Sequence, residues 1–241
     1  MGRGILGWFM VTSLLIAGLV RLGVWQVDRA HQKQAAHAFY LAHLQLPAVP
    51  LPEIAHDPIE DLIGRTATLT GHYLAGVKVL LDNQSHNGQP GYLVLTPFAL
   101  GSKETVLINR GWIPMGMTRD QVAVEPAPAG EITMRGIISG APARGISLPG
   151  DEQIETLSGG VRRVQYIDYK TLARQAAVSL LPYLILLDPQ APGGYVRDWP
   201  VPGSDEDRHW SYAVQWFAMA VAVFILFVVL TVKRGRRAIT Q

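Results

Sequence analysis

The sequence predicts a membrane protein in which two transmembrane α-helices, one at each end, flank a mainly antiparallel β (α+β) extracytoplasmic domain. Each end of the 241-residue chain carries a long apolar run, and basic residues flank both runs. Between them lie short β-branched segments separated by glycine and proline. We expect transmembrane helices at 4–25 and 210–232, the domain at 26–208, and a basic cytoplasmic tail at 233–241.

The two apolar runs are long enough to cross a bilayer. Tyr212 to Val232 contains no charged residue, and about 20 apolar residues cross the hydrocarbon core as a helix. Gly4 to Val20 is shorter, but it extends to Trp25 because an arginine near a helix end can reach the interface. The rival interpretation of this first run is a cleaved signal peptide. Its apolar core is longer than the usual ~7–15 residues, and no A-x-A site follows at the right distance.

Charge predicts how the chain is oriented. All 19 acidic residues lie from Asp28 to Asp207, whereas Arg3 and the basic tail lie outside the spans. Basic residues beside a span favour the cytoplasmic side. Both termini are therefore predicted to be cytoplasmic and the domain to lie on the far side, in the periplasm if the host is a bacterium. Because the basic excess is confined to the chain ends, nothing indicates nucleic-acid binding.

The predicted domain begins with a helix at 26–45 that continues out of the membrane and ends before three prolines. Strands are expected at 65–73, 77–81, 92–98, 105–109, 132–138, 164–167 and 183–187. Tyr169 to Ala177 has helical spacing, and Asp168 is a suitable N-cap for it. Residues 189–203 are rich in proline and glycine and are expected to be a loop. A barrel is one arrangement that these strands allow.

The sequence contains no motif of an enzyme. It lacks G-x-S-x-G, a P-loop and H-E-x-x-H, so we expect no catalytic residues and no enzymatic activity. With no cysteine, thiolate metal sites are excluded. His31, His37 and His43 are six residues apart and do not share a helix face, so no metal site is expected.

Aromatic and polar residues gather where both spans meet the outer membrane surface. Antiparallel spans would bring two groups to one depth: Trp25, Gln26, Arg29 and Lys33 on the first helix, and His209, Tyr212, Gln215 and Trp216 on the second. Two interpretations stay open. Such residues form interfacial belts and anchors in most membrane proteins; alternatively, His209 is a suitable axial ligand for haem iron among aromatic neighbours.

Small residues predict where the two spans touch. Ser13 and Ala17, and Ala218 and Ala222, form small-xxx-small pairs that permit close approach of helices. A second local prediction concerns Arg110 to Pro114, which follow a β-branched strand. We expect a strand end and tight turn there, with a positive φ at Gly111 and Trp112 packed into the domain. A binding role for this segment is an alternative to a purely structural one.

Several segments, in order, resemble the Surfeit locus protein family, assembly factors for cytochrome c oxidase. They are Leu22–Gln26 with Arg29 and Lys33, Leu81–Gln84, Gly91–Pro97, Val106–Pro114 and His209–Phe217. The similarity runs from the first span to the second. Each motif is weak alone, but their order and the matching topology are specific.

This resemblance implies a non-catalytic assembly factor in a bacterial inner membrane that helps to insert haem a into the catalytic subunit of a haem-copper terminal oxidase. That subunit and haem a synthase are the implied partners, besides membrane lipid. His209 matches the histidine proposed to bind haem in bacterial members. The implied cofactor site comprises His209, Arg208, Tyr212, Trp216, Trp25, Gln26 and Arg29. Arg208 stands where the family usually has asparagine, and its guanidinium could pair with a haem propionate. The alternative is a docking or scaffold protein without a cofactor.

Overall fold

The computed structural model describes residues 2–74, 76–101, 104–116, 122, 124–143, 154–157 and 160–239, with side chains from residue 7 to residue 235. The chain forms two compact units. The helix unit comprises Met1–Phe39 and Val201–Gln241, and the β domain comprises Tyr40–Pro200.

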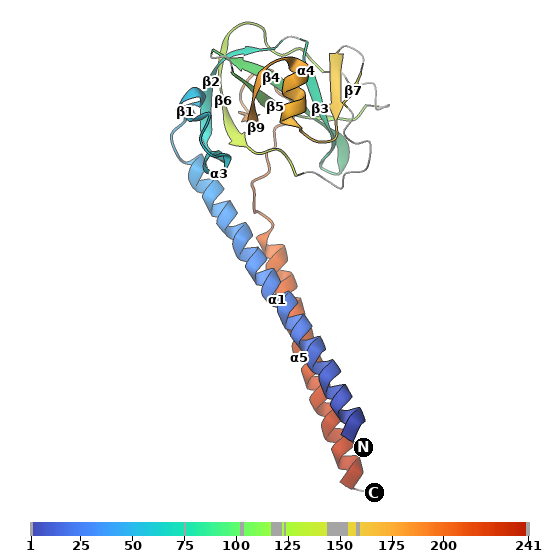
Figure 1. Cartoon of the computed structure of the whole chain (residues 1–241). Coiled ribbons are helices and arrows are strands. Elements are labelled where there is room, and N and C mark those ends of the chain that lie inside the picture. Colours follow the sequence, from blue (N-terminus) through green and yellow to red (C-terminus); the bar gives the residue numbers. More distant parts are fainter. Residues whose placement is uncertain are drawn as a thin grey trace. The chain divides into compact units, whose positions relative to one another are not determined.

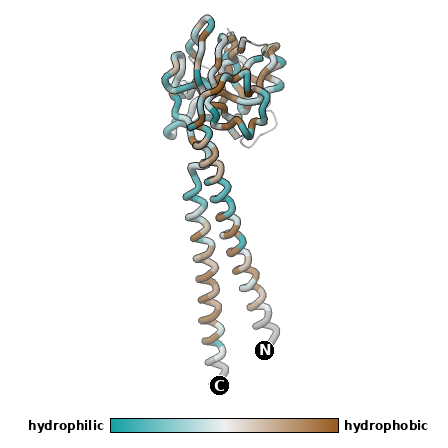
Figure 2. The backbone as a smooth tube through the Cα atoms, turned by 90° about the vertical axis from the view of Figure 1, so that its left-hand side faces the viewer, coloured by the Kyte–Doolittle hydropathy of each residue, from teal (hydrophilic) through white to brown (hydrophobic). Residues whose placement is uncertain are grey.

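The helix unit is built from two long helices, α1 (Gly2–Leu44) and α5 (Glu206–Ile239), which run side by side (Figure 1). Both are long and apolar enough to cross a membrane, over Gly7–Leu44 and Glu206–Gly235. Hydrophobic colours cover most of α5, whereas its first turns are hydrophilic (Figure 2). The predicted helical continuation past residue 26 is confirmed, because α1 stays helical until three residues before Pro47.

The β domain holds nine strands and three short helices among the described residues. In chain order these are β1 (Val49–Pro50), α2 (Leu51–Ile54), α3 (Ile59–Leu62), β2 (Thr66–Tyr73), β3 (Lys78–His86), β4 (Gln89–Leu100), β5 (Glu104–Pro114), β6 (Ile132–Ser139), β7 (Glu155–Thr156), β8 (Val161–Val164), α4 (Tyr169–Ala176) and β9 (Ser179–Leu187). Most pairings are antiparallel; only β1–β2, β3–β8 and β5–β9 are parallel. The predicted mainly antiparallel α+β class is therefore confirmed.

Five strands close into a ring. The pairings run β2–β6–β9–β5–β4, and β4 returns to β2 through the pairs Gly71 with Leu100 and Tyr73 with Phe98. Beyond this ring, β3, β8 and β7 extend the sheet from the other half of β4. Asn87 and Gly88 join β3 to β4, both with positive φ, as a two-residue hairpin turn requires. The barrel that the strand pattern allowed is thus present.

β5 is the most deeply buried strand of the domain. Its residues from Thr105 to Ile113 are all buried, because side chains on its two faces enter different apolar clusters. Val106 and Ile108 pack with Leu69, Phe98 and others in the largest cluster. Leu107 packs with Leu172 of α4 in a second cluster.

Local predictions in the β domain are mostly confirmed. Asp168 caps α4 by accepting hydrogen bonds from the backbone N–H groups of Lys170 and Thr171, at 3.0 and 3.2 Å. The strand expected at 164–167 lies instead at 161–164. The turn expected at Arg110 to Pro114 is wrong, because β5 continues through it. Val196, in the expected loop, forms an antiparallel bridge with Trp112 there.

Candidate functional site

The contact between α1 and α5 follows a regular spacing. On α1 the least exposed positions recur at intervals of four and three residues: Thr12, Ile16, Leu19, Gly23, Gln26, Ala30, Lys33 and His37. On α5 a similar series includes His209, Ala213, Trp216, Ala220, Val223, Phe227 and Leu230. This three-four alternation is the packing pattern of helices that cross at a shallow angle. Gly23 lies under the Phe217 ring, where an added Cβ would sit only 2.7 Å from a ring carbon.

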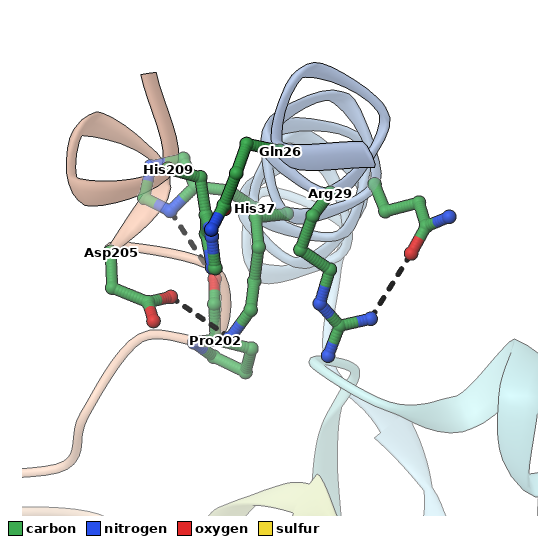
Figure 3. A network of polar contacts seen from close by, with 8 residues as sticks. Gln26, Arg29, His37, Pro202, Asp205 and His209 are labelled. Carbon is green, nitrogen blue, oxygen red and sulfur yellow. Dashed lines mark hydrogen bonds and ion pairs between the residues drawn. The ribbon is translucent and has the colours of Figure 1, made fainter. Parts of the chain in front are cut away.

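The contact between α1 and α5 along these positions is called the seam below. Its polar part centres on His209 and Gln26. His209 Nδ1 lies 2.7 Å from Gln26 Oε1, and Figure 3 shows the two side chains pointing toward one another across the helices. Gln26 is buried, with 8 % of its surface exposed, and His209 is half-buried. Because Oε1 can only accept a hydrogen bond, the His209 ring donates its Nδ1–H to Gln26 in this arrangement. His209 Nε2 has no hydrogen-bond or ion-pair partner in the described part of the chain.

Two further contacts extend the network toward the end of the seam (Figure 3). Lys33 Nζ lies 2.9 Å from Asp205 Oδ1, and this contact lowers the pKa of the Asp205 carboxyl. His37 Nδ1 lies 3.3 Å from the carbonyl oxygen of Pro202. A glycine is required at position 203, between Pro202 and Asp205 in the sequence. Its φ is +79°, and a Cβ there would lie 2.3 Å from the Lys33 carbonyl oxygen. The cluster of Gln26, Lys33, His37, Asp205 and His209 is called the interhelical polar cluster below.

The structure separates the other expected site residues from this cluster. Trp25 and Tyr212 are 56 % and 44 % exposed. Arg29 extends away from α5 and donates to Gln32 on its own helix at 3.0 Å (Figure 3). The side chain of Arg208 is exposed, whereas Trp216 is half-buried on the seam. Of the seven residues expected at the site, only Gln26 and His209 belong to the interhelical polar cluster, and they are hydrogen-bonded to each other.

The small-residue prediction for the helix contact is wrong. Ser13, Ala17, Ala218 and Ala222 are all exposed. Small residues do lie at the contact, but at the spacing of the seam, where Ala30 is fully buried and Ala213 is 1 % exposed. Sequence reasoning also missed Asp205 and His37. The spacing of three and four residues is visible only in the burial of α1, because the residues at those positions, Lys33 and His37 among them, share no hydrophobic pattern in the sequence.

A second polar centre lies inside the β domain at Arg110. Its side chain is 1 % exposed, and its guanidinium donates to three carbonyl oxygens, those of Gly193 at 2.6 Å, Glu125 at 3.2 Å and Pro126 at 3.4 Å. The rings of Tyr195 and Tyr73 lie 5.1 and 5.8 Å away. Burial raises the pKa of Tyr73 to about 12, although Arg110 and Arg197 oppose this shift.

The residues after Arg110 explain the local geometry. Gly111 has a φ of +116°, as predicted, and an added Cβ would lie 2.6 Å from the carbonyl oxygen of Val196. Trp112 is buried, also as predicted, and its Nε1–H donates to the carbonyl oxygen of Gln84 at 3.0 Å. This segment therefore ties β5 to two distant parts of the chain. Its alternative role in binding stays a prediction.

The two centres offer different chemistry. At the interhelical polar cluster, His209 presents Nε2 without a partner among the described residues, and a histidine nitrogen of this kind can bind a metal ion. No group of three or more His, Cys, Asp or Glu that could hold a metal ion occurs among the described residues. The Arg110 centre offers a buried positive charge between the rings of Tyr73 and Tyr195.

Comparison with known proteins identifies the family. The model of the SURF1 family matches residues 13–221. A SURF1-like protein of Drosophila melanogaster is 28 % identical over 95 % of this chain and 78 % of its own length. One from Rickettsia felis is 22 % identical over 91 % of this chain and 95 % of its own length. The cytochrome oxidase assembly protein SHY1 of Saccharomyces cerevisiae is 38 % identical over 38 % of this chain and 24 % of its own length. The family match covers most of α1, the whole β domain and the first part of α5, and the chain belongs to the SURF1 family.

Proposed function

We propose that this protein is a non-catalytic assembly factor for a haem-copper terminal oxidase, a cytochrome c oxidase, and that it assists delivery of haem a to the catalytic subunit. Membership of the SURF1 family and the name of the yeast relative support the role in oxidase assembly. The haem a part rests on one observation, the hydrogen bond between His209 and Gln26.

That hydrogen bond gives His209 the form that an iron ligand needs. A metal-bound histidine commonly donates its other ring N–H to a nearby acceptor, which fixes the ring orientation. Here Nδ1–H donates to Gln26 Oε1, and the lone pair of Nε2 is left for iron. The half-buried ring of Trp216 supplies an apolar surface on the same seam.

The site suits cargo that is held and then released. His209 would be the protein ligand to the iron, and the described residues contain no larger cluster of ligands around it. Arg208, although exposed and outside the cluster, lies next to His209 in the sequence and could reach a propionate. Trp25, Arg29 and Tyr212 would then serve at the interface with lipid or with the oxidase subunit.

The proposal includes a location and partners. The protein would lie in the bacterial inner membrane with both termini cytoplasmic, the β domain periplasmic, and lipid around the two spans. The oxidase catalytic subunit would receive haem a, and haem a synthase would supply it. A reporter fused after Gln241 should be active only on the cytoplasmic side. Activity on the exported side would contradict this orientation.

A second candidate function is docking of oxidase subunits without any cofactor. The exposure of Trp25 and Tyr212 favours it, because such residues are typical of an interfacial belt. The two functions differ in whether the purified protein carries haem.

The test is the absorption spectrum of the full chain, purified in detergent after expression together with haem a synthesis. We expect a Soret band that disappears in His209→Ala. It should persist in the matched control His31→Ala, an exposed histidine of α1 whose ring packs on Trp210. Gln26→Leu should retain haem with a shifted spectrum, because the ligand loses its acceptor. If His209→Ala carries as much haem as the wild type, the haem proposal is wrong and the docking function gains support.

Oxidase assembly itself is tested in the host. Deleting the gene should lower the haem a content and activity of the terminal oxidase, and the wild-type gene should restore both. His209→Ala should restore less than His31→Ala does. Full restoration by both variants would leave assembly supported but remove His209 from it.

A further inference from the structure

The β domain contains a pocket to which the proposed function assigns no role. Its volume is about 520 Å³, within the usual range of about 300–1,000 Å³ for small-molecule sites. The end of β2, the start of β3 and the segment from Pro126 to Glu131 form its walls. Arg110 and Thr96 line it as well.

The positive charge of Arg110 at this pocket lacks a carboxylate partner. Its three hydrogen bonds all go to main-chain carbonyls, and no ion pair with a described acidic residue is present. A guanidinium has five N–H donors, so these bonds leave two of them unused. A buried charge is normally paired, because the low-dielectric interior solvates it poorly. The pocket is therefore a favourable place for a negative charge.

Thr96 supplies an independent sign of a missing ligand. Its side chain is 2 % exposed, and its Oγ1 has no hydrogen-bond partner in the part of the chain that the structure describes. Buried hydroxyl groups are almost always hydrogen-bonded. Since Thr96 lines the pocket, an oxygen atom of a ligand could accept its O–H.

The remaining lining residues define what kind of ligand fits. Lys78 donates one Nζ–H to the carbonyl oxygen of Val124 at 2.8 Å and retains two more donors. Among the described lining residues Glu131 is the one carboxylate, so Lys78 and Arg110 give this part of the lining a net positive formal charge. Tyr73, Pro126 and Pro128 contribute apolar surface.

We propose that this pocket binds a small molecule or side group that carries an oxyanion, a carboxylate or phosphate, on an apolar body. The oxyanion lies near Lys78 and Arg110 and accepts a hydrogen bond from the Thr96 hydroxyl group. The apolar body packs against Tyr73 and the prolines. The inference does not depend on haem binding at His209.

The test is isothermal titration calorimetry of the full chain in a nonionic detergent, with detergent-only titrations subtracted. The probes are 4-phenylbutyrate, its neutral amide and inorganic phosphate. We expect saturable binding of 4-phenylbutyrate, at least about tenfold tighter than binding of the amide, because only the acid brings a charge to a charged donor. Phosphate should bind more weakly than 4-phenylbutyrate, because it has no apolar body.

Two variants separate a ligand site from a purely structural Arg110. Thr96→Val keeps the side-chain shape and should weaken 4-phenylbutyrate binding at least about tenfold. Lys78→Met should weaken it about two- to fivefold, as expected for a partly exposed charge. The control Lys170→Met, at an exposed position of α4, should not change the affinity. Arg110 itself is left intact because it holds the walls of the pocket.

Three results would overturn the proposal. They are the absence of saturable 4-phenylbutyrate binding to the folded protein, equal binding of the amide, and an unchanged affinity in Thr96→Val. Phosphate binding as tightly as 4-phenylbutyrate would overturn the apolar part. None of these readouts involves haem, so the proposed function can fail while this site is supported, and the reverse.

Discussion

In the helix unit, the side chains of the interhelical polar cluster pair mostly with one another and all but Gln26 stay partly exposed, whereas the β domain buries Arg110 completely among main-chain carbonyls. The Lys33 and Asp205 side chains of the interhelical polar cluster are 29 % and 41 % exposed. Arg110 is 1 % exposed, and every hydrogen bond that it donates ends on a backbone oxygen.

This difference separates residues that can be tested for function directly from those that cannot. An exposed member of the interhelical polar cluster, such as Lys33 or Asp205, can be removed with little effect on folding, because water can replace its partner. Loss of Arg110 instead leaves buried carbonyls without donors. The effect of a substitution on haem content at His209 is thus informative, while loss of any activity in an Arg110 variant could reflect misfolding.

The largest effect is expected for Arg110→Met, which keeps an apolar stem and removes all three donated hydrogen bonds. In this variant Tyr195 still donates to the carbonyl oxygen of Glu125, but the carbonyl oxygens of Gly193 and Pro126 lose the donor that Arg110 supplies. At about 1–3 kcal/mol for each unsatisfied buried group, we expect a loss of about 3 kcal/mol or more of unfolding free energy. Urea unfolding followed by tryptophan fluorescence would measure it.

The matched control is Arg135→Met on β6, which removes an exposed arginine and should change the unfolding free energy little. Equal effects of the two variants would break the comparison, because burial would then not distinguish the two arginines.

A smaller effect is expected for Gly111→Ala. The φ of +116° strains any residue with a Cβ, and the new methyl would meet the Val196 carbonyl oxygen at 2.6 Å. Backbone strain of this kind costs about 1–3 kcal/mol, which should appear as a lower urea midpoint. In the control Gly101→Ala, the added Cβ meets no atom within 4 Å and φ is not positive. If both variants are equally stable, the bridge between Trp112 and Val196 does not constrain this strand as described.

The sequence predicted element positions better than it predicted their contacts. Apolar runs placed α1 and α5, short β-branched or apolar segments placed β2, β4 and β9, and Asp168 was identified as a cap. These features depend on local chemistry, such as hydrocarbon length or the orphan N–H groups of a helix start. The strand β8 was misplaced, because its residues include Arg162 and Arg163 and show no apolar alternation.

The candidate site shows the same limit. His209 and Gln26 were both expected at the interface, but their direct pairing depends on how α1 and α5 rotate about their axes. That rotation is set by a seam of mixed residues, Thr12, Gly23, Ala30 and Lys33 among them, which no hydrophobicity pattern marks. The sequence predicts a strand end and turn at Arg110 to Pro114, because this segment follows a β-branched strand, and it predicts a positive φ at Gly111. The distant Val196 makes that φ compatible with β5 instead.

The smallest effect, at Asp168, tests whether burial alone explains the comparison. Like Arg110, its side chain bonds to main-chain groups of the β domain, but it is exposed like the interhelical cluster. Asp168→Ala removes the cap of α4 and should lower the unfolding free energy by about 1 kcal/mol. The control Asp198→Ala changes an exposed aspartate outside any helix and should have no measurable effect.

A second substitution at this position, Asp168→Asn, isolates the contribution of the charge through the pH dependence of stability. The hydrogen bonds from Thr171 hold the pKa of the Asp168 carboxyl below its usual value. A lowered pKa in the folded state means that the stabilisation is complete above the unfolded-state pKa, about 3.9, and is lost as pH falls through the folded-state pKa. Asp168→Asn keeps a capping side chain without charge, so the wild type should exceed it in stability at pH 7 and match it in strong acid. If the stability difference between the wild type and Asp168→Asn does not change with pH, the shape of the side chain and not its charge makes the cap. Solvent exposure would then not explain why the Asp168 cap is weaker than the hydrogen bonds of Arg110.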